Sequence, residues 1–383
     1  MKIVHLCLAS FYIEGFGYQE NLIPKYNKKD GHEVTIIAST ETFIDNKQLG
    51  YLEPCEYINE DQIKVIRLPY RKILPQILMR KVRLYPKLYK ILTDEKPDVI
   101  LFHGPQSGEL LTVARYKKNN PHVKLYVDNH ADEGNSAKGY FSRVLLHDFY
   151  YRGVLQRSLP VIDKVFYVTY ERKLFLEKHY NVPKSKMEFY PLGGEVIERE
   201  EREIYRIEKR KELGYTDKDI VLIHAGKMDR LKKTIDIVNN FSSVADERLK
   251  LVIIGSFTDE VKKEITPLIK KDKRIAYLGW KVTDELTKYF CASDLYVQPG
   301  THTVLMEHAT CCSLPVVVAN LESYKLLLKD SNHAWVIDRV DEMKKIFKEI
   351  CEDPFILRVK SQSAYEFSKE VLDYKKIAAR LYS

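Results

Sequence analysis

The sequence has few of the features that mark secreted, membrane-spanning or disordered proteins. Among its 383 residues are only six cysteines and two tryptophans. The cysteines form no CxxC pair, which argues against a disulfide framework or a cysteine metal site and favours reduced thiols in a cytoplasmic protein. No run approaches the roughly 18–20 apolar residues that span a bilayer. Internal repeats and low-complexity tracts are also absent, so we expect an ordinary folded protein.

The first ten residues contain a short apolar run with one lysine, as the start of a secretory signal would. Polar residues follow from Tyr12 onward without the small-residue pattern of a cleavage site. We therefore expect a buried first strand in this segment rather than a signal peptide.

The charge balance is mildly basic, with 62 Lys and Arg against 54 Asp and Glu, a net charge of +8. This excess is too small to indicate nucleic acid as a partner. Part of it lies in Arg71–Lys90, which has seven basic residues and no acidic one. Apolar residues recur there and just beyond at spacings of three and four: Leu78, Val82, Tyr85, Tyr89 and Leu92. Such a pattern is typical of a helix on an anionic membrane surface, or of a solvated helix with a core stripe, and Pro75 and Pro86 would break it.

Short apolar runs alternate with longer amphipathic segments along the whole chain. In the first half the predicted strands are Lys2–Leu8, His32–Ala38, Ile63–Leu68, Asp98–His103, Val123–Asp128, Lys164–Val168 and Met187–Tyr190. In the second half they are Ile220–Ala225, Lys250–Ile254, Ile275–Leu278, Leu295–Val297, Pro315–Val318 and Ala334–Ile337. This alternation predicts an α/β protein with two doubly wound, Rossmann-like domains, which bind ligands at the carboxyl ends of their strands.

A highly charged segment separates the two sets of strands. In Glu195–Asp219, 16 of 25 residues are charged and no apolar run occurs. We place the domain boundary between residues 197 and 198. The rest of the segment, Glu203–Leu213, is expected to form a solvated helix that ends at Gly214. Residues 354–383 are helical by pattern.

Two loops of the first half carry candidate site residues. Gly15, Phe16 and Gly17 follow the first strand and precede a helix, where glycines let the backbone approach a ligand or merely form a tight turn. Glu20 excludes the GxGxxG dinucleotide pattern. Asp128 and His130 follow a later strand and could orient a substrate hydroxyl, although an Asx turn that caps the next helix has the same composition. His103 with Gly104 forms a similar, weaker candidate.

Two loops of the second half favour a phosphate ligand. Gly226, Lys227, Arg230 and Lys232 lie directly after a buried strand, where cations beside a glycine suit phosphate, unless they form a solvated loop. Pro299 and Gly300 end another strand. The helix that follows offers backbone N–H groups to a diphosphate, and the carboxylate of Glu307 could accept hydrogen bonds from a ribose diol or pair with a neighbouring lysine.

At these residues the chain resembles the glycosyltransferases of family 4, the retaining, group 1-type enzymes with the GT-B fold. The segments that carry the resemblance are Gly31-His32-Glu33-Val34, Gly226-Lys227 through Lys232, Leu278-Gly279-Trp280, Ala292-Ser293-Asp294-Leu295, and Glu307 followed by Leu314-Pro315-Val316-Val317. One position departs from the family. The family often has a first glutamate eight residues before its second, and here Pro299 stands eight residues before Glu307.

The resemblance implies two Rossmann-like domains that face each other across a cleft. Residues 1–197 would bind the acceptor, residues 198–364 would bind the nucleotide-sugar donor, and a C-terminal helix at about 365–383 would return to the first domain. The implied catalytic residues are His130, Lys227, Lys232 and Glu307. The implied donor-binding residues are Gly226, Arg230, Gly279, Trp280, Gly300, His302, Thr303, Val304 and Glu307. The implied acceptor-binding residues are Gly15, Phe16, Gly17 and Asp128.

The implied reaction is the metal-independent, retaining transfer of a hexose from a nucleotide sugar, with UDP favoured over GDP. The acceptor would be a glycan or a polyprenyl-linked sugar, as in bacterial surface polysaccharide assembly, on the cytoplasmic face of the membrane. No cofactor and no metal are expected, because no convincing DxD motif occurs. An epimerase of the same fold, or a non-catalytic partner subunit with an altered donor loop, remains an alternative.

Overall fold

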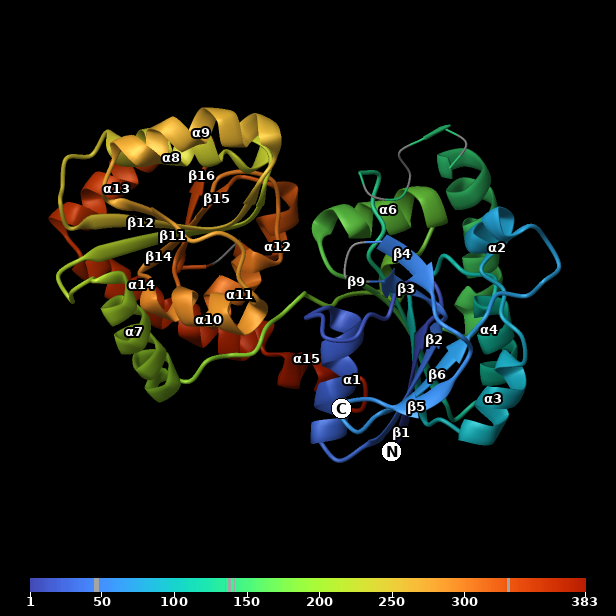
Figure 1. Ribbon diagram of the computed structural model, residues 1–383. Helices are drawn as coiled ribbons and strands as arrows, with labels where there is room; N and C mark the ends of the chain where they lie inside the picture. The colour runs from blue at the N-terminus through green and yellow to red at the C-terminus, as the bar shows by residue number, and fades with distance from the viewer. Residues whose placement is uncertain (45–47, 135, 137–138, 141, 329–330) are drawn as a thin grey trace. The chain divides into compact units, whose positions relative to one another are not determined.

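The computed structural model describes residues 1–44, 48–134, 136, 139–140, 142–328 and 331–383. The chain forms two compact units. Unit 1 comprises Met1–Pro191 and Tyr374–Ser383, and unit 2 comprises Leu192–Asp373. Each unit has a largely or wholly parallel sheet with helices on both faces (Figure 1), so the predicted fold class of two doubly wound α/β domains is confirmed. The boundary lies at Pro191, six residues before the predicted residue 197.

The sheet of unit 1 has the strand order β10-β9-β8-β7-β1-β2-β6-β5. Its strands are β1 Lys2–Cys7, β2 Glu33–Ser39, β5 Glu56–Ile58, β6 Lys64–Leu68, β7 Val99–His103, β8 Lys124–Asn129, β9 Lys164–Tyr167 and β10 Met187–Phe189. All neighbours pair in parallel except β5 with β6. The central strands β1, β2 and β7 are buried on both faces, which explains why they appear in the sequence as continuous apolar runs, whereas the edge strand β5 is largely exposed.

The helices of unit 1 cover both faces of this sheet (Figure 1). They are α1 Gln19–Lys29, α2 Gln76–Val82, α3 Leu88–Glu95, α4 Leu110–Asn119, the π-helix η1 Ser142–Tyr151, α5 Arg152–Ser158, α6 Tyr170–Tyr180 and α15 Tyr374–Ala379. Helices α1 and α15 pack on one face through a shared apolar cluster that includes Ile23, Ile377 and Leu381. The last residues of the chain therefore complete the core of unit 1.

Two antiparallel features of unit 1 are absent from the sequence predictions. A hairpin pairs β3 Glu41–Ile44 with β4 Gln48–Tyr51, and β5 adds an antiparallel edge strand to the main sheet. Their short, mixed polar sequences give no clear strand period.

The predicted apolar stripe of Arg71–Lys90 does not form one face. Arg83 and Lys87 have left-handed backbone angles, with φ of 52° and 60°, so the chain turns between α2 and α3. Leu92 is buried in the core of unit 1, whereas Leu78 is exposed on α2. The expected breaks near Pro75 and Pro86 are confirmed. In the described residues, no helix is long and apolar enough to cross a bilayer.

Unit 2 contains a six-stranded parallel sheet in the order β13-β12-β11-β14-β15-β16. Its strands are β11 Ile220–Met228, β12 Leu249–Phe257, β13 Ile275–Tyr277, β14 Leu295–Gln298, β15 Val316–Ala319 and β16 Ala334–Ile337. Its helices are α7 Arg199–Leu213, α8 Thr234–Ser242, α9 Asp259–Lys271, α10 Thr283–Ala292, α11 Leu305–Cys311, α12 Lys325–Leu328, α13 Glu342–Glu352 and α14 Phe355–Phe367, followed by the π-turn η6 Ser368–Leu372. Helices α8 and α9 cover one face of the sheet, and α7 and α10 lie on the other (Figure 1). Helix α7 ends at Gly214, whose φ is 70°, as the sequence predicts.

Candidate functional site

The strand order of unit 2 reverses between β11 and β14. The chain runs from β11 to β12 and β13 in one direction, and from β14 to β15 and β16 in the other. Doubly wound sheets bind their ligands at such a switch point, beyond the carboxyl ends of the strands. The loops at residues 229–233 and 299–304 follow these two strands, and they contain most of the predicted donor-binding residues.

The two loops are held in direct contact. The Thr301 N–H donates to the Leu231 carbonyl at 3.1 Å. The Lys232 Nζ donates to the carbonyls of Thr301 at 3.0 Å and His302 at 3.1 Å. Gly300 permits this approach, because a Cβ there would lie 2.2 Å from the Leu231 carbonyl oxygen. The structure therefore brings Lys232 together with Gly300 and with His302, which lies 70 residues later in the sequence.

Glu307 lies on α11 beneath these loops and is only 1% exposed. One of its carboxylate oxygens, Oε1, is 3.0 Å from His302 Nε2. The other, Oε2, is buried without a hydrogen-bond partner among the described residues. The alternative expectation, a pair with a neighbouring lysine, is not what the described contacts show. A buried acceptor of this kind costs free energy unless a ligand or water donates to it.

The cations of this loop differ in their surroundings. Lys227 is exposed at the end of β11, and Lys232 is half-buried, so burial lowers the pKa of its ammonium group. Arg230 turns away to α9, where its Nε lies 2.5 Å from Glu260 and its guanidinium also pairs with Glu264. Its charge is neutralised there, whereas Lys227 and Lys232 have no ion pair with an acidic residue among the described contacts.

Three glycines bring neighbouring backbones together beside this loop. Gly226 and Gly255 have φ of 130° and 137°, and a Cβ on Gly255 would lie 1.8 Å from the Gly226 carbonyl oxygen. The Gly255 N–H donates to the Gly279 carbonyl at 2.8 Å. Trp280 follows and is 68% exposed, and Val304 is exposed as well. The remaining predicted donor residue, Thr303, accepts a long hydrogen bond from the Leu305 N–H at 3.4 Å.

The glycine loop of unit 1 is open. A Cβ on Gly15, whose φ is 74°, or on Gly17 would contact no atom within 4 Å. The rings of Phe16 and Tyr18 lie 5.2 Å apart, and Asn21 Nδ2 donates to the Ile13 carbonyl at 2.8 Å. The loop is thus anchored at its base, and its glycines face open space.

Asp128 and His130 lie together at the carboxyl end of β8. Asp128 is fully buried and accepts hydrogen bonds from the Gly104 N–H at 2.9 Å and from His103 Nδ1 at 2.7 Å. His130 Nε2 is 3.6 Å from Asp128 Oδ2. Burial opposes protonation of His130, but the charge of Asp128 outweighs it and raises the pKa of His130. The Asx contact that was the alternative for this segment is made by Asn129, which accepts from the Ala131 N–H at 3.3 Å.

Sequence reasoning missed two polar residues behind this pair. His5 on β1 is fully buried and contacts both His103 and Asn27 of α1. A single histidine within an apolar strand gave no local signal, because its partners lie 98 and 22 residues away.

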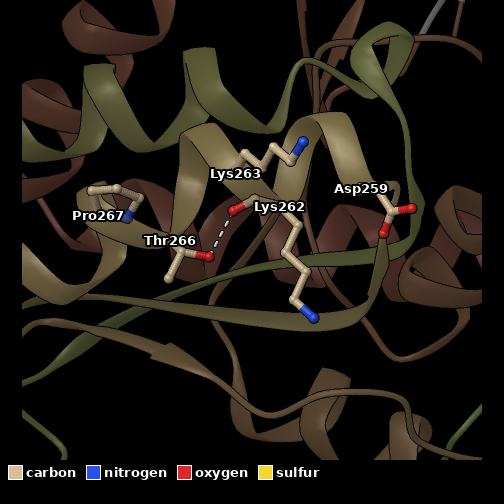
Figure 2. A pocket seen from close by; sticks show the side chains of 5 residues that line it. All are labelled: Asp259, Lys262, Lys263, Thr266 and Pro267. Atoms are coloured by element: carbon tan, nitrogen blue, oxygen red, sulfur yellow. Dashed lines mark hydrogen bonds between the residues drawn. The ribbon is translucent and has the colours of Figure 1, made fainter.

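A surface hollow of about 480 Å³ lies along α9, the helix whose Glu260 and Glu264 pair with Arg230. Figure 2 shows the side chains that line it, with Lys262 and Lys263 diverging and Thr266 Oγ1 donating to the Lys262 carbonyl at 2.6 Å. None of the predicted site residues lines this hollow.

Comparisons with known proteins agree with this geometry. The family model "Glycosyltransferase Family 4" matches residues 23–196, and "Glycosyl transferases group 1" matches residues 206–367. No curated protein sequence matches the chain. Among solved structures, HepE from Anabaena in complex with UDP is similar, with a TM-score of 0.69 and 14% identity over 99% of this chain and 98% of that one.

Two further solved structures share the fold. A glycosyltransferase from Rickettsia africae has a TM-score of 0.68 and 12% identity, and sucrose-phosphate synthase from Thermosynechococcus elongatus has a TM-score of 0.66 and 14% identity. Each match covers 99% of this chain and 96% of the other. The two family models together account for most of the sequence. The chain therefore belongs to the glycosyltransferases of the group 1, family 4 type, which have the GT-B fold.

Proposed function

We propose that this glycosyltransferase uses a UDP-linked sugar, which binds unit 2 at the switch point between β11 and β14. The observation that carries the proposal is the buried Glu307 Oε2, which has no hydrogen-bond partner among the described residues. A ribose diol supplies the donors that this oxygen lacks. The similarity to HepE, which was solved with UDP and with UDP-glucose, supports the choice of nucleotide.

Lys227 and Lys232 would neutralise the diphosphate. Lys232 is partly withdrawn from water, which strengthens its attraction to an anion. In the proposed retaining reaction, the bond from the sugar C1 to the diphosphate oxygen breaks, and the acceptor oxygen bonds to C1 on the same face. The acceptor proton passes to the departing phosphate oxygen. Two lysines at the leaving group could supply the charge stabilisation that a metal ion supplies elsewhere, so we propose a metal-independent reaction.

The donor sugar would meet the shortened loop after β14. Pro299 occupies the position of the family's first glutamate, so His302 and Thr303 are the side chains proposed to contact the sugar. His302 is held by its contact with Glu307 and by the proximity of its ring to that of Tyr324, whose centroid is 5.1 Å away. We expect the identity of the transferred sugar to depend on His302.

Unit 1 would bind the acceptor through the open glycine loop and His130. A membrane-linked acceptor is supported by a basic, apolar surface that we call the α2–η1 surface. Its exposed apolar residues are Ile73, Leu74, Ile77 and Leu78 near or on α2, with Leu145 and Phe149 on η1. Its basic residues are Arg71, Lys72, Arg80, Lys81, Arg143 and Arg152. The Tyr150 hydroxyl donates to the Val82 carbonyl at 3.0 Å, which joins the two elements. We propose that this surface rests on anionic lipid.

Calorimetric titration of the purified chain with UDP, GDP and ADP, in buffer containing EDTA, tests the donor site. UDP should bind without added metal and more tightly than GDP or ADP. Lys232→Ala should weaken UDP binding by about tenfold or more, and Glu307→Ala should do the same, since each removes a charged or charge-assisted contact worth about 1.5–3 kcal/mol.

Lys262→Ala is the matched control, because it removes a lysine of the same unit that lies on α9 away from the switch point. It should leave the affinity unchanged. Unaltered UDP affinity in both site variants would refute the assigned residues. Conversion of a nucleotide sugar without any acceptor would favour an epimerase, and absence of both nucleotide binding and donor hydrolysis would favour a non-catalytic subunit.

A further inference from the structure

A continuous chain of hydrogen bonds runs through the interior of unit 1, from the C-terminal helix to Asp128, which lies beside the candidate acceptor residue His130. We call it the unit 1 relay. Its members, in order, are the Ala378 carbonyl of α15, Asn27 of α1, His5 of β1, His103 of β7 and Asp128 of β8. His130 lies just beyond this end, with its Nε2 3.6 Å from Asp128 Oδ2. The four side chains from Asn27 to Asp128 are fully buried.

Each of the four links from the Ala378 carbonyl to Asp128 is short enough for a hydrogen bond. Asn27 Nδ2 is 3.3 Å from the Ala378 carbonyl oxygen, and Asn27 Oδ1 is 2.9 Å from His5 Nε2. His5 Nδ1 is 3.1 Å from His103 Nε2. His103 Nδ1 is 2.7 Å from Asp128 Oδ2. Because both ends are acceptors, the direction of every proton between them can be worked out.

The direction follows from the Ala378 carbonyl, which can only accept. Asn27 must therefore present its amide N–H₂ to that carbonyl and its oxygen to His5. Facing an oxygen, His5 Nε2 must carry the proton. Burial lowers the pKa of His5 to about 3, so the ring is neutral, and its Nδ1 has a lone pair that accepts from His103 Nε2.

His103 thus donates from Nε2 to His5, and its Nδ1 faces a carboxylate. Burial opposes ionisation of Asp128, but the two neighbouring histidines outweigh it and lower its pKa. The Gly104 N–H faces one oxygen of Asp128 at 2.9 Å and His103 Nδ1 faces the other at 2.7 Å, as around an ionised carboxylate. Such a carboxylate can only accept, so His103 donates from Nδ1 as well. A ring that donates from both nitrogens is an imidazolium, and its charge offsets that of Asp128 within the interior.

We propose that Asn27 and His5 are positioning residues, which hold His103 as an imidazolium against Asp128 and thereby set the protonation of His130. His130 competes with His103 for the same carboxylate oxygen, at 3.6 Å against 2.7 Å. While His103 is charged, it offsets part of the negative charge of Asp128. Asp128 then raises the pKa of His130 less than it would alone. A catalytic use of the His130 protonation state rests on the proposed function. The protonation states of His5, His103 and His130 do not depend on it.

Other charged and titratable groups near His130 and Asp128 do not change the direction of the hydrogen bonds in the relay. On α6, Arg172 Nε contacts the His130 carbonyl at 3.4 Å, but its guanidinium is paired with Asp132 at 2.8 Å. On α1, Glu20 favours the charged form of His130. The Cys7 thiol on β1 is also close to Asp128, and burial raises its pKa, so it adds no charge.

Removal of the Asn27 acceptor has a defined consequence. In Asn27→Leu, the Nε2 proton of His5 has no acceptor, and His5 can place its proton on Nδ1 and donate to His103. His103 Nε2 then accepts this hydrogen bond and carries no proton. With a proton on Nδ1 only, the ring of His103 is neutral. The Asp128 charge is left uncompensated, so the pKa of His130 should rise by about half a unit or more. A purely structural role for Asn27 predicts no such rise.

Long-range ¹H–¹⁵N NMR of histidine-labelled full-length protein, without any ligand, reads these states between pH 6 and 8. In the wild type we expect His5 as the neutral Nε2–H tautomer and His103 protonated on both nitrogens. In Asn27→Leu we expect a neutral His103 and a higher titration midpoint for His130. Asn120→Leu removes a side-chain hydrogen bond of α4 in the same unit, without contact to the relay, and should leave the spectra unchanged.

A neutral His103 in the wild type would overturn the proposal, and this measurement needs no variant to fold. An unchanged His130 midpoint in a folded Asn27→Leu protein would also overturn it. Because no nucleotide or acceptor is present, either failure would leave the proposed donor function intact. Loss of UDP binding in the donor-site variants would likewise say nothing against the relay.

Discussion

At the scale of single residues, Gly300 is a position of the donor site where the backbone leaves no room for a side chain. A Cβ at this position would lie 2.2 Å from the Leu231 carbonyl oxygen and 2.6 Å from the Lys232 Cα. Both are backbone atoms, so the two loops would have to separate. We expect Gly300→Ala to lower the free energy of unfolding of unit 2 by about 1–3 kcal/mol, as overpacking does elsewhere, and to weaken UDP binding.

Urea unfolding and nucleotide titration measure these two effects. Gly17→Ala is the stability control, because a Cβ there contacts nothing within 4 Å. A Gly300→Ala protein with wild-type stability and affinity would show that the loops tolerate separation.

The sequence predicts site residues that can be recognised from their immediate neighbours in the chain. It does not predict residues whose contacts lie far away in the sequence. Lys232 was predicted because it follows a strand in a polar, glycine-containing loop, and Glu307 because it lies on the helix that follows such a loop. The ion pairs that draw Arg230 to α9 involve residues 30 and 34 positions later, so no local spacing could have revealed them. His5 was missed for the same reason.

At the scale of elements, α2 and η1 expose unusual amounts of apolar surface. Ile77 is 72% exposed and Phe149 is 79% exposed, and both lie among basic residues. If the α2–η1 surface rests on lipid, the double variant Ile77→Ser, Phe149→Ser should partition into anionic vesicles at least about tenfold more weakly, given about 1.5–3 kcal/mol for each large apolar side chain.

Co-sedimentation with vesicles of phosphatidylglycerol or of phosphatidylcholine tests this expectation. The wild type should prefer the anionic vesicles, and the preference should fall with added salt. Ile204→Ser on α7, which is 64% exposed in unit 2, is the matched control. Equal binding of the wild type to both vesicle types would count against the surface.

The strands of both sheets were predictable because parallel strands buried on both faces are continuous apolar runs. The separate β3–β4 hairpin and the antiparallel edge strand β5 were not, since these strands are short and mix polar with apolar residues. The apolar stripe expected along Arg71–Lys90 does not form a single helix face. Left-handed residues at Arg83 and Lys87 redirect the chain, and a non-glycine residue in that conformation gives no dependable signal.

At the scale of the whole molecule, several histidines are buried in neutral form. Burial lowers the pKa of His5 to about 3 and that of His147 to about 4 in unit 1. It lowers the pKa values of His224 and His333 to about 4 in unit 2. Below pH 6.5 the unfolded chain binds protons that these folded sites refuse, so stability is lost as the pH falls.

Two such histidines in unit 1 should cost that unit about 3 kcal/mol per pH unit near pH 5. Burial also lowers the pKa of His308 in unit 2 to about 4, so the three in unit 2 should cost about 4 kcal/mol per pH unit. His130 acts in the opposite sense, because its raised pKa contributes stability below pH 6.5 that is lost as the pH rises through the folded value. Urea midpoints measured at pH 7, 6 and 5 should therefore decline steeply. A flat profile would contradict the neutral, buried state of these rings.

The central claim is that unit 2 binds a UDP-sugar with its ribose against Glu307. Saturation-transfer NMR with a panel of UDP-, GDP- and ADP-sugars tests it most directly. We predict the strongest transfer to the ribose and uracil protons of UDP-sugars, without metal, and its loss in Glu307→Ala but not in Lys262→Ala. Transfer to no nucleotide sugar, or equal transfer in the wild type and Glu307→Ala, would contradict the account.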